Sequence, residues 1–231
     1  MRPKYLFILP CLLFPFVIVY CSRNSARSRM HIQDLEYALT VDDPTVRLGA
    51  VAALKEEGSE GIPGLSTAAR DSDETVRKMA IFTLGEVGGE EAAKELAKLL
   101  KDPDRTTRSR AILALGATGR AGFPYLLQAL GSEPFPRARM FAAASISRMA
   151  EPGDTASIME RFEQQDAATQ MHLITALARI ADDEAFNALK DLVQSPNRLV
   201  RFYVVNTLSE TPPDERTIPI FTLSLSDAAP E

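Results

Sequence analysis

The chain has 231 residues, of which 45% are hydrophobic and 25% charged, and its net charge is −5. This composition is ordinary for a globular protein and excludes a disordered chain. Trp is absent and aromatic residues make up only 7%, so the core must be built from Leu, Ala, Val and Ile, which suits helices. Both cysteines, Cys11 and Cys21, lie near the start of the chain. The rest of the chain therefore has no disulfide or zinc–thiolate site.

Residues 1–30 have the organisation of an export leader. Two positive charges precede an apolar run from Tyr5 to Tyr20, and a polar segment follows. The run is shorter than the roughly 20 residues that span a bilayer. It resembles a bacterial lipoprotein leader, in which Cys21 would carry the lipid, although Tyr20 occupies a position that is normally small. Lipidation at Cys21, an uncleaved membrane anchor and cleavage at another position all stay open.

A short leading helix is expected at residues 32–39, where the sequence IQDLEYAL is amphipathic. It lies directly before the first copy of a repeated pattern. We therefore expect it to cap the apolar inner face of that copy.

The pattern then recurs at a period of 30 or 31 residues, most clearly in DSDETVRKMAIFTLGEVG (71–88) and DPDRTTRSRAILALGATG (102–119). Aligned on one position, here called the frame residue, the six copies have Arg47, Arg77, Arg108, Arg139, Gln170 and Arg201. Small or apolar residues follow three, four and seven positions later and share one face of a helix. Each copy therefore begins with a helix, which we call the A helix.

Cap residues and a second helix complete each copy. Asp43, Asp102 and Ser195 each precede a proline, which matches an N-cap followed by proline at the first helical position. Asp71 or Asp73 is the expected cap of the second copy. The second helices, here called B helices, are expected in EGIPGLSTAA, EEAAKELAKLL, AGFPYLLQAL, DTASIMERFEQQ, EAFNALKDLV and TIPIFTLSLS.

One helix pair cannot bury its own apolar face, so the copies must stack. The predicted fold is an all-α, right-handed α-solenoid of about six helix pairs plus the leading helix. The expected organisation is a leader or anchor at 1–30, the solenoid at 31–226 and a disordered tail at 227–231.

The stretches DDPTVRLGAVAAL, DSDETVRKMAIFTLGEVG and DPDRTTRSRAILALGATG resemble HEAT-like repeats, in particular the short type found in phycobilin lyase subunits. In such repeats the frame arginine is expected to bond an Asp or loop carbonyls of the adjacent copy. The resemblance therefore implies a structural ladder of Arg47, Arg77, Arg108, Arg139 and Arg201, with an interruption at Gln170. It implies little about function, because such repeats serve lyases, scaffolds and receptors alike.

No residues with the spacing of a catalytic or metal site stand out. Neither His31 nor His172 has a Cys, His or acidic partner at metal-ligand spacing. The glycines of GEVGG (85–89) follow a predicted helix and lack the Lys and Ser or Thr of a phosphate-binding loop. The sequence predicts a protein without catalytic residues, metal or cofactor.

Charge is unevenly distributed along the chain. Residues 100–150 contain 8 Lys and Arg against 3 Asp and Glu, whereas residues 31–99 contain 7 against 14 and residues 151–231 contain 6 against 14. The basic middle is either a solvated face or a site for an anionic partner. A concave binding surface is expected from the B helices. The candidate partner-binding residues are Lys94, Lys98, Arg105, Arg110, Arg120, Arg137, Arg148, Arg161, Gln164 and Lys190.

The leading hypothesis is a non-enzymatic protein-binding scaffold of the bacterial cell envelope, held at the membrane by its leader or a lipid and facing the periplasm. An export leader and an acidic chain argue against nucleic acid as the partner. The resemblance implies an alternative, a bilin (phycobilin) lyase-like subunit. A third hypothesis is a structural module that self-associates through its apolar C-terminal helix.

Overall fold

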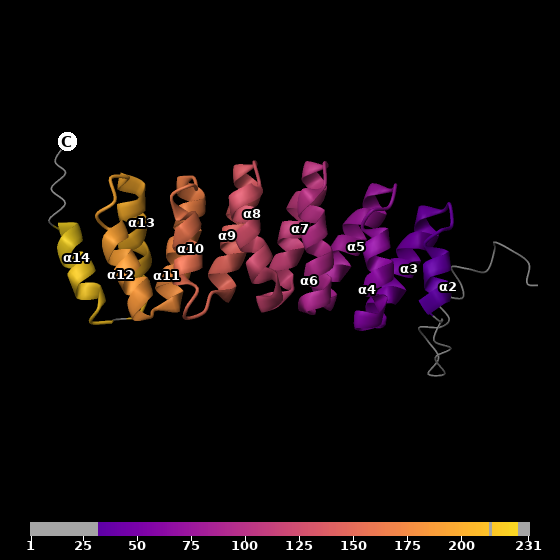
Figure 1. Cartoon of the computed structure of the whole chain (residues 1–231), viewed down its shortest axis with the longest axis horizontal. Helices are drawn as coiled ribbons and strands as arrows, with labels where there is room; N and C mark the ends of the chain where they lie inside the picture. The colour runs from indigo at the N-terminus through magenta and orange to yellow at the C-terminus, as the bar shows by residue number, and fades with distance from the viewer. Residues whose placement is uncertain (1–31, 213, 226–231) are drawn as a thin grey trace, which may run out of the picture.

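The computed structural model describes residues 32–212 and 214–225, and within them the chain forms thirteen α-helices, three short 3-10 helices and no strand. Figure 1 shows the helices following one another in chain order along the long axis, with α2 and α14 at opposite ends. The predicted all-α solenoid is confirmed.

The helices form six successive pairs behind a leading helix, α2 (Ile32–Ala38). The A helices are α3 (Pro44–Glu56), α5 (Glu74–Val87), α7 (Arg105–Ala117), α9 (Pro136–Met149), α11 (Ala167–Ile180) and α13 (Arg198–Ser209). The B helices are α4 (Ile62–Ala68), α6 (Gly89–Lys98), α8 (Phe123–Ser132), α10 (Thr155–Phe162), α12 (Asp183–Leu192) and α14 (Thr217–Leu225). The 3-10 helices are η1 (Gly58–Gly61), η2 (Leu99–Lys101) and η3 (Gly119–Gly122).

Residues 1–31 and 226–231 lie outside the described ranges, and with them the predicted leader, Cys21 and the predicted tail. Among the described helices, none combines the length and apolar character needed to cross a membrane.

The core runs along the stack between the two layers of helices. In α5 the residues three, four and seven positions after the frame, Ala80, Ile81 and Leu84, are almost fully buried, as are their counterparts in the other copies except Val205, which is partly buried. Successive A helices approach closely where small residues meet. A Cβ added to Gly85 would lie 3.0 Å from the carbonyl oxygen of Ala114 in the next A helix. Small residues at this position therefore set the spacing of the stack.

Two of the predicted helix caps are wrong by two residues. Asp43 caps α3 as predicted, but the caps of α7 and α13 are Asp104 and Asn197, not Asp102 and Ser195. The side chain of Asp102 accepts the N–H of Asp104 at 2.8 Å, and the hydroxyl of Ser195 accepts the N–H of Asn197 at 3.2 Å. The two predicted residues therefore shape the turn that leads into the helix.

Candidate functional site

Frame arginines hold the loop that enters each A helix. The Nη1 of Arg108 donates to the carbonyl oxygens of Asp102 and Pro103 at 2.9 and 3.1 Å, six and five positions before it. Arg47, Arg77, Arg139 and Arg201 bind the equivalent carbonyls at 2.8–3.2 Å. These carbonyls lie outside the helices, so the guanidinium supplies hydrogen bonds that no helix provides.

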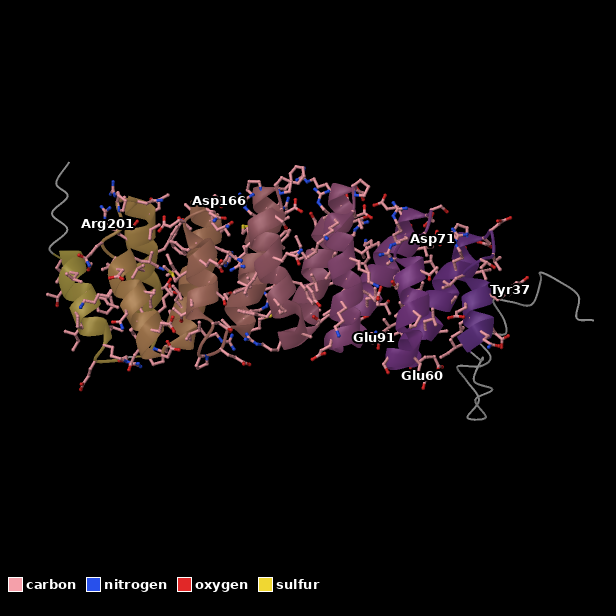
Figure 2. The ribbon with its side chains drawn as sticks, in the orientation of Figure 1. Tyr37, Glu60, Asp71, Glu91, Asp166 and Arg201 are labelled. Atoms are coloured by element: carbon pink, nitrogen blue, oxygen red, sulfur yellow. The ribbon has the colours of Figure 1, made fainter. Side chains whose placement is uncertain are left out.

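Within the described ranges, Arg47, Arg108 and Arg139 also bind an acidic residue of the next copy. Arg47 makes a two-pronged contact with Asp71 at 2.7 and 2.8 Å. The other two pairs are Arg108 with Glu133, at 2.9 and 3.4 Å, and Arg139 with Asp166, at 3.2 Å. Figure 2 shows Asp71, Asp166 and Arg201 along the same long edge of the molecule, opposite Glu60 and Glu91. The contacts along this edge join one copy to the next.

Charge pairing along this edge shifts the pKa of Asp71. Burial alone would raise the pKa of Asp71. The hydrogen bonds from Arg47 and from the backbone N–H of Asp73 outweigh burial and hold the pKa of Asp71 below its ordinary value. Asp71 is therefore charged at neutral pH, as a partner of Arg47 must be.

The contacts between copies are interrupted at two frame positions. Arg77 binds only carbonyls and makes no ion pair with the carboxylates of the described residues. Gln170 is 5% exposed; its Nε2 donates to the carbonyl of Phe162 at 3.2 Å, and its Oε1 has no hydrogen-bond partner in the described part of the chain. The sequence predicts the interruption at Gln170 but not the one at Arg77.

In the basic middle, two of the candidate arginines are already bound to acidic residues of the same chain. Arg110 pairs with Glu74 at 2.9 Å, and both terminal nitrogens of Arg120 lie 2.6 Å from carboxylate oxygens of Asp154. The Asp154 hydrogen bonds raise the pKa of Arg120 further. The other candidates in this segment, Arg105, Arg137 and Arg148, make no ion pair with a described carboxylate, so their charges remain available.

Among the candidates expected on the B helices, some are likewise paired with a carboxylate and others are not. Three of them pair with a glutamate of their own helix, namely Lys94 with Glu90, Lys98 with Glu95 and Arg161 with Glu160. Gln164 and Lys190 are exposed.

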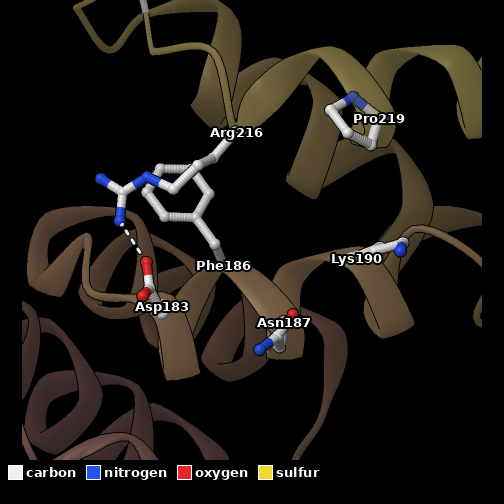
Figure 3. Close-up of a pocket in the computed structure, with 6 residues that line it drawn as sticks. All are labelled: Asp183, Phe186, Asn187, Lys190, Arg216 and Pro219. Atoms are coloured by element: carbon white, nitrogen blue, oxygen red, sulfur yellow. Dashed lines mark hydrogen bonds and ion pairs between the residues drawn. The ribbon is translucent and has the colours of Figure 1, made fainter.

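Lys190 lines a hollow of about 350 Å³ between α12 and α14, shown in Figure 3. Arg216 lies 4.1 Å above the ring of Phe186 and binds Asp183 at 2.9 Å. Arg216 also binds Asp214 and lowers the pKa of that carboxyl to about 2. The charge of Arg216 is thus engaged within the protein.

Large apolar side chains are exposed mainly on the A helices, which sequence reasoning missed. Met79 and Phe82 of α5 are 43% and 59% exposed, and Leu113 of α7 is 50% exposed. Leu199 and Phe202 are also exposed on α13, which α9 and α11 separate from α7. Among the described B helices only α14 exposes comparable residues, Ile218 and Leu225. The exposed A-helix residues lie on the side of the helix opposite the buried positions. The aligned copies show this placement in the sequence.

His172 is half-buried on α11. Burial, and secondarily the positive charge of Arg148, lower its pKa. Within the described ranges no group of three or more His, Cys, Asp and Glu side chains is arranged to hold a metal ion.

A family model described as HEAT repeats matches residues 62–147, 94–169 and 155–231. No curated protein has a matching sequence.

Several solved structures are similar to the chain. Human deoxyhypusine hydroxylase is 19% identical, with 86% of this chain and 76% of that chain covered and a TM-score of 0.47. The complex of CpcE and CpcF of phycocyanin lyase from Nostoc sp. PCC7120 is 16% identical, with 88% and 98% covered and a TM-score of 0.45. A designed armadillo repeat protein in complex with the peptide (KR)4 is 17% identical, with 78% and 99% covered and a TM-score of 0.43.

Proposed function

The chain belongs to the HEAT repeat family, and from this premise we propose that it is a non-enzymatic scaffold that binds a protein partner. Stacked helix pairs present long, continuous surfaces, and repeat proteins use such surfaces for binding. The copies of this chain are joined by buried side chains and by the arginine contacts between loops. Such a stack holds surface residues of distant copies in a fixed relation.

The observation that carries the proposal is the exposure of large apolar side chains on the A helices. Met79 and Phe82 of α5 and Leu113 of the neighbouring helix α7 expose between 43% and 59% of their surface, and Phe202 of α13 lies apart from them. Single exposed apolar residues are common, but a series that continues over neighbouring helices is typical of interaction sites. A protein partner would remove these side chains from water.

Capture of partners by the tagged full-length chain tests this function. We expect at least one protein to co-purify at a stoichiometric ratio through a second size-exclusion step, and to be absent when the tag alone is used. Purification of the chain without any such partner, from both membrane and soluble fractions, would contradict the proposal. A shift in absorbance when bilin is added would instead support a lyase-like subunit.

We place the scaffold in the bacterial cell envelope because of its leader-like residues 1–30, with Arg2 and Lys4 before the apolar run and Cys21 after it. Mass spectrometry of the mature amino terminus tests this part of the proposal. We expect either an acylated Cys21 or a membrane-associated chain that retains the apolar run. An unmodified full-length chain in the soluble fraction would refute an envelope location while leaving partner binding open.

A further inference from the structure

Charge is segregated between the two helix layers. The A helices α7, α9, α11 and α13 contain no Asp or Glu. The two acidic residues of α5 are both paired, Glu74 with Arg110 and Glu86 with Lys55, each at 2.9 Å. The B helices α6 and α12, by contrast, carry three acidic residues each. The A helices α7, α9, α11 and α13 are therefore net basic, and among the described B helices α6 and α12 are net acidic.

On α9 the basic and apolar residues form one stripe. Arg137, Phe141, Ala144 and Arg148 follow at spacings of four, three and four residues, which places them on one side of the helix. The guanidinium of Arg137 lies 5.6 Å from the ring centre of Phe141, and Nη1 of Arg148 donates to the carbonyl of Ala144 at 3.0 Å. Both arginines are exposed and make no ion pair with a described carboxylate.

The same stripe continues on the neighbouring A helices. Relative to the frame residue Arg139, Arg137 lies two positions before it. Phe141, Ala144 and Arg148 lie two, five and nine positions after it. At the positions after the frame residue, α5 has Met79, Phe82 and Glu86, and α7 has Arg110, Leu113 and Ala117. Glu86 and Arg110 are both engaged in ion pairs, with Lys55 and Glu74. We call this side of α5, α7 and α9 the A face. It has an apolar centre that crosses three helices, with free positive charge at both ends of α9.

We propose that the A face binds an acidic amphipathic helix of a partner protein, a refinement that rests on the proposed function. The apolar side of the helix would cover Phe82, Leu113 and Phe141, and its carboxylates would pair with Arg137 and Arg148. Packed helices are about 8–10 Å apart, so crossing three of them takes a ligand helix of roughly 14–20 residues at 1.5 Å per residue.

Acidic residues along one border of the A face favour a narrow ligand over a broad anionic surface. Asp73 and Asp104, the N-cap residues of α5 and α7, lie at the ends of these helices, and Asp102 lies in the loop before α7. A flat anionic membrane would meet these carboxylates and be repelled. A single helix about 10 Å wide can lie between this border and the opposite ends of the A helices.

A displayed library of 18-residue peptides tests the proposal without a known partner. Each peptide carries Leu or Phe at helical spacing, and its remaining positions are drawn at random from Glu, Lys and Gln. Selection on the full-length chain is expected to enrich peptides with a net negative charge. Enrichment of basic or neutral peptides, or of none, would overturn the proposal.

Variants of the chain then locate the binding surface. Reversing two charges of the A face (Arg137→Glu with Arg148→Glu) and replacing its apolar centre (Phe82→Gln with Leu113→Gln) are each expected to weaken binding of a selected peptide at least tenfold. The control reverses two charges of the B helices (Lys94→Glu with Lys190→Glu) and should leave binding within twofold of the unmodified chain. Matching circular dichroism and melting curves show that each variant is folded. Unchanged binding in both A-face variants would refute the assignment of this surface.

Vesicles containing phosphatidylglycerol separate a membrane from a protein ligand. We expect weak binding that the two arginine substitutions do not alter. Vesicle binding that depends on Arg137 and Arg148, without enrichment of acidic peptides, would replace the proposal with a membrane site.

If the chain captures a cellular partner that the A-face variants retain, this inference fails and the scaffold function stands. If no partner is captured, the scaffold function itself fails.

Discussion

Arg108 and Arg77 occupy the same position in successive copies, but only Arg108 also binds a carboxylate. The side chains of Arg108 and Glu133 are 13% and 4% exposed, and Nε of Arg108 lies 2.9 Å from Glu133. Arg77 binds the loop carbonyls of Asp71 and Ser72 only. Substituting each arginine in turn therefore separates two contributions to stability, one from the loop hydrogen bonds and one from the contact between copies.

We predict that Arg108→Met is much more destabilising than Arg77→Met. Removing one member of a buried ion pair costs about 3 kcal/mol, because it leaves an uncompensated charge. The loss of carbonyl hydrogen bonds at Arg77 should cost about 1 kcal/mol. Urea unfolding followed by circular dichroism measures both values.

Substitution of the partner provides the control for this comparison. Glu133→Gln in the Arg108→Met background removes the unpaired charge and should recover part of the lost stability. Equal costs for the two arginine substitutions would show that the contact with Glu133 does not join the copies. A purely structural role of the frame arginines also requires that neither substitution changes the affinity for a partner.

At the scale of single helices, Gly116 and Gly131 form a natural pair. Each is the next-to-last residue of its helix, Gly116 in α7 and Gly131 in α8. A Cβ on Gly116 would lie 2.4 Å from the Oγ of Ser145 and 3.0 Å from its Cβ, whereas a Cβ on Gly131 would meet no atom within 4 Å. Of these two glycines, only Gly116 is needed for the close approach of two helices.

We predict opposite effects of alanine at these two glycines. Gly131→Ala should raise the free energy of unfolding by about 0.5–1 kcal/mol, because alanine loses less conformational freedom in a helix. Gly116→Ala should lower it by about 1–3 kcal/mol, because α7 and α9 must move apart. Urea unfolding under identical conditions checks both signs. The cost at Gly116 should shrink in a Ser145→Gly background, and a stabilising Gly116→Ala would contradict the close contact.

The sequence predicts the helices well because each copy repeats the same pattern of buried positions. Ala80, Ile81 and Leu84 could be assigned to the core from their spacing alone. Helix starts were harder to predict, because Asp102 and Asp104 are both good caps and only the turn geometry selects Asp104. Periodicity along one helix also does not show that Gly116 contacts the neighbouring copy.

The candidate site was less predictable than the fold. The pattern of a single chain shows which arginines are present, but not which of them bind a carboxylate of a neighbouring copy, as Arg110 and Arg120 do. A count along the sequence places positive charge in the middle of the chain. In space, six of these eight Lys and Arg residues lie on the A helices α7 and α9, and Lys101 and Arg120 lie on η2 and η3. Whether this surface binds a partner stays a prediction.

At the scale of the whole molecule, the stack should be least cooperative at its last described copy. Leu115 of α7 and Leu208 of α13 both lie seven positions after their frame residue and are 0% and 3% exposed. The third copy has neighbours on both sides, while the sixth packs against the fifth. Stability in a repeat stack is approximately a sum of terms for each copy and for each contact between neighbours.

We therefore predict different outcomes for the same substitution in the two copies. Leu→Ala in a core costs about 2–5 kcal/mol. At Leu115 this cost should lower the midpoint of the main unfolding transition, because the copies on both sides lose their support. At Leu208 it should unfold α13 and α14 locally and leave the main transition in place. Hydrogen exchange with mass spectrometry should then show faster exchange in these two helices alone. If Leu208→Ala accelerates exchange equally from α3 to α14, the chain unfolds as one cooperative unit and the nearest-neighbour description does not hold.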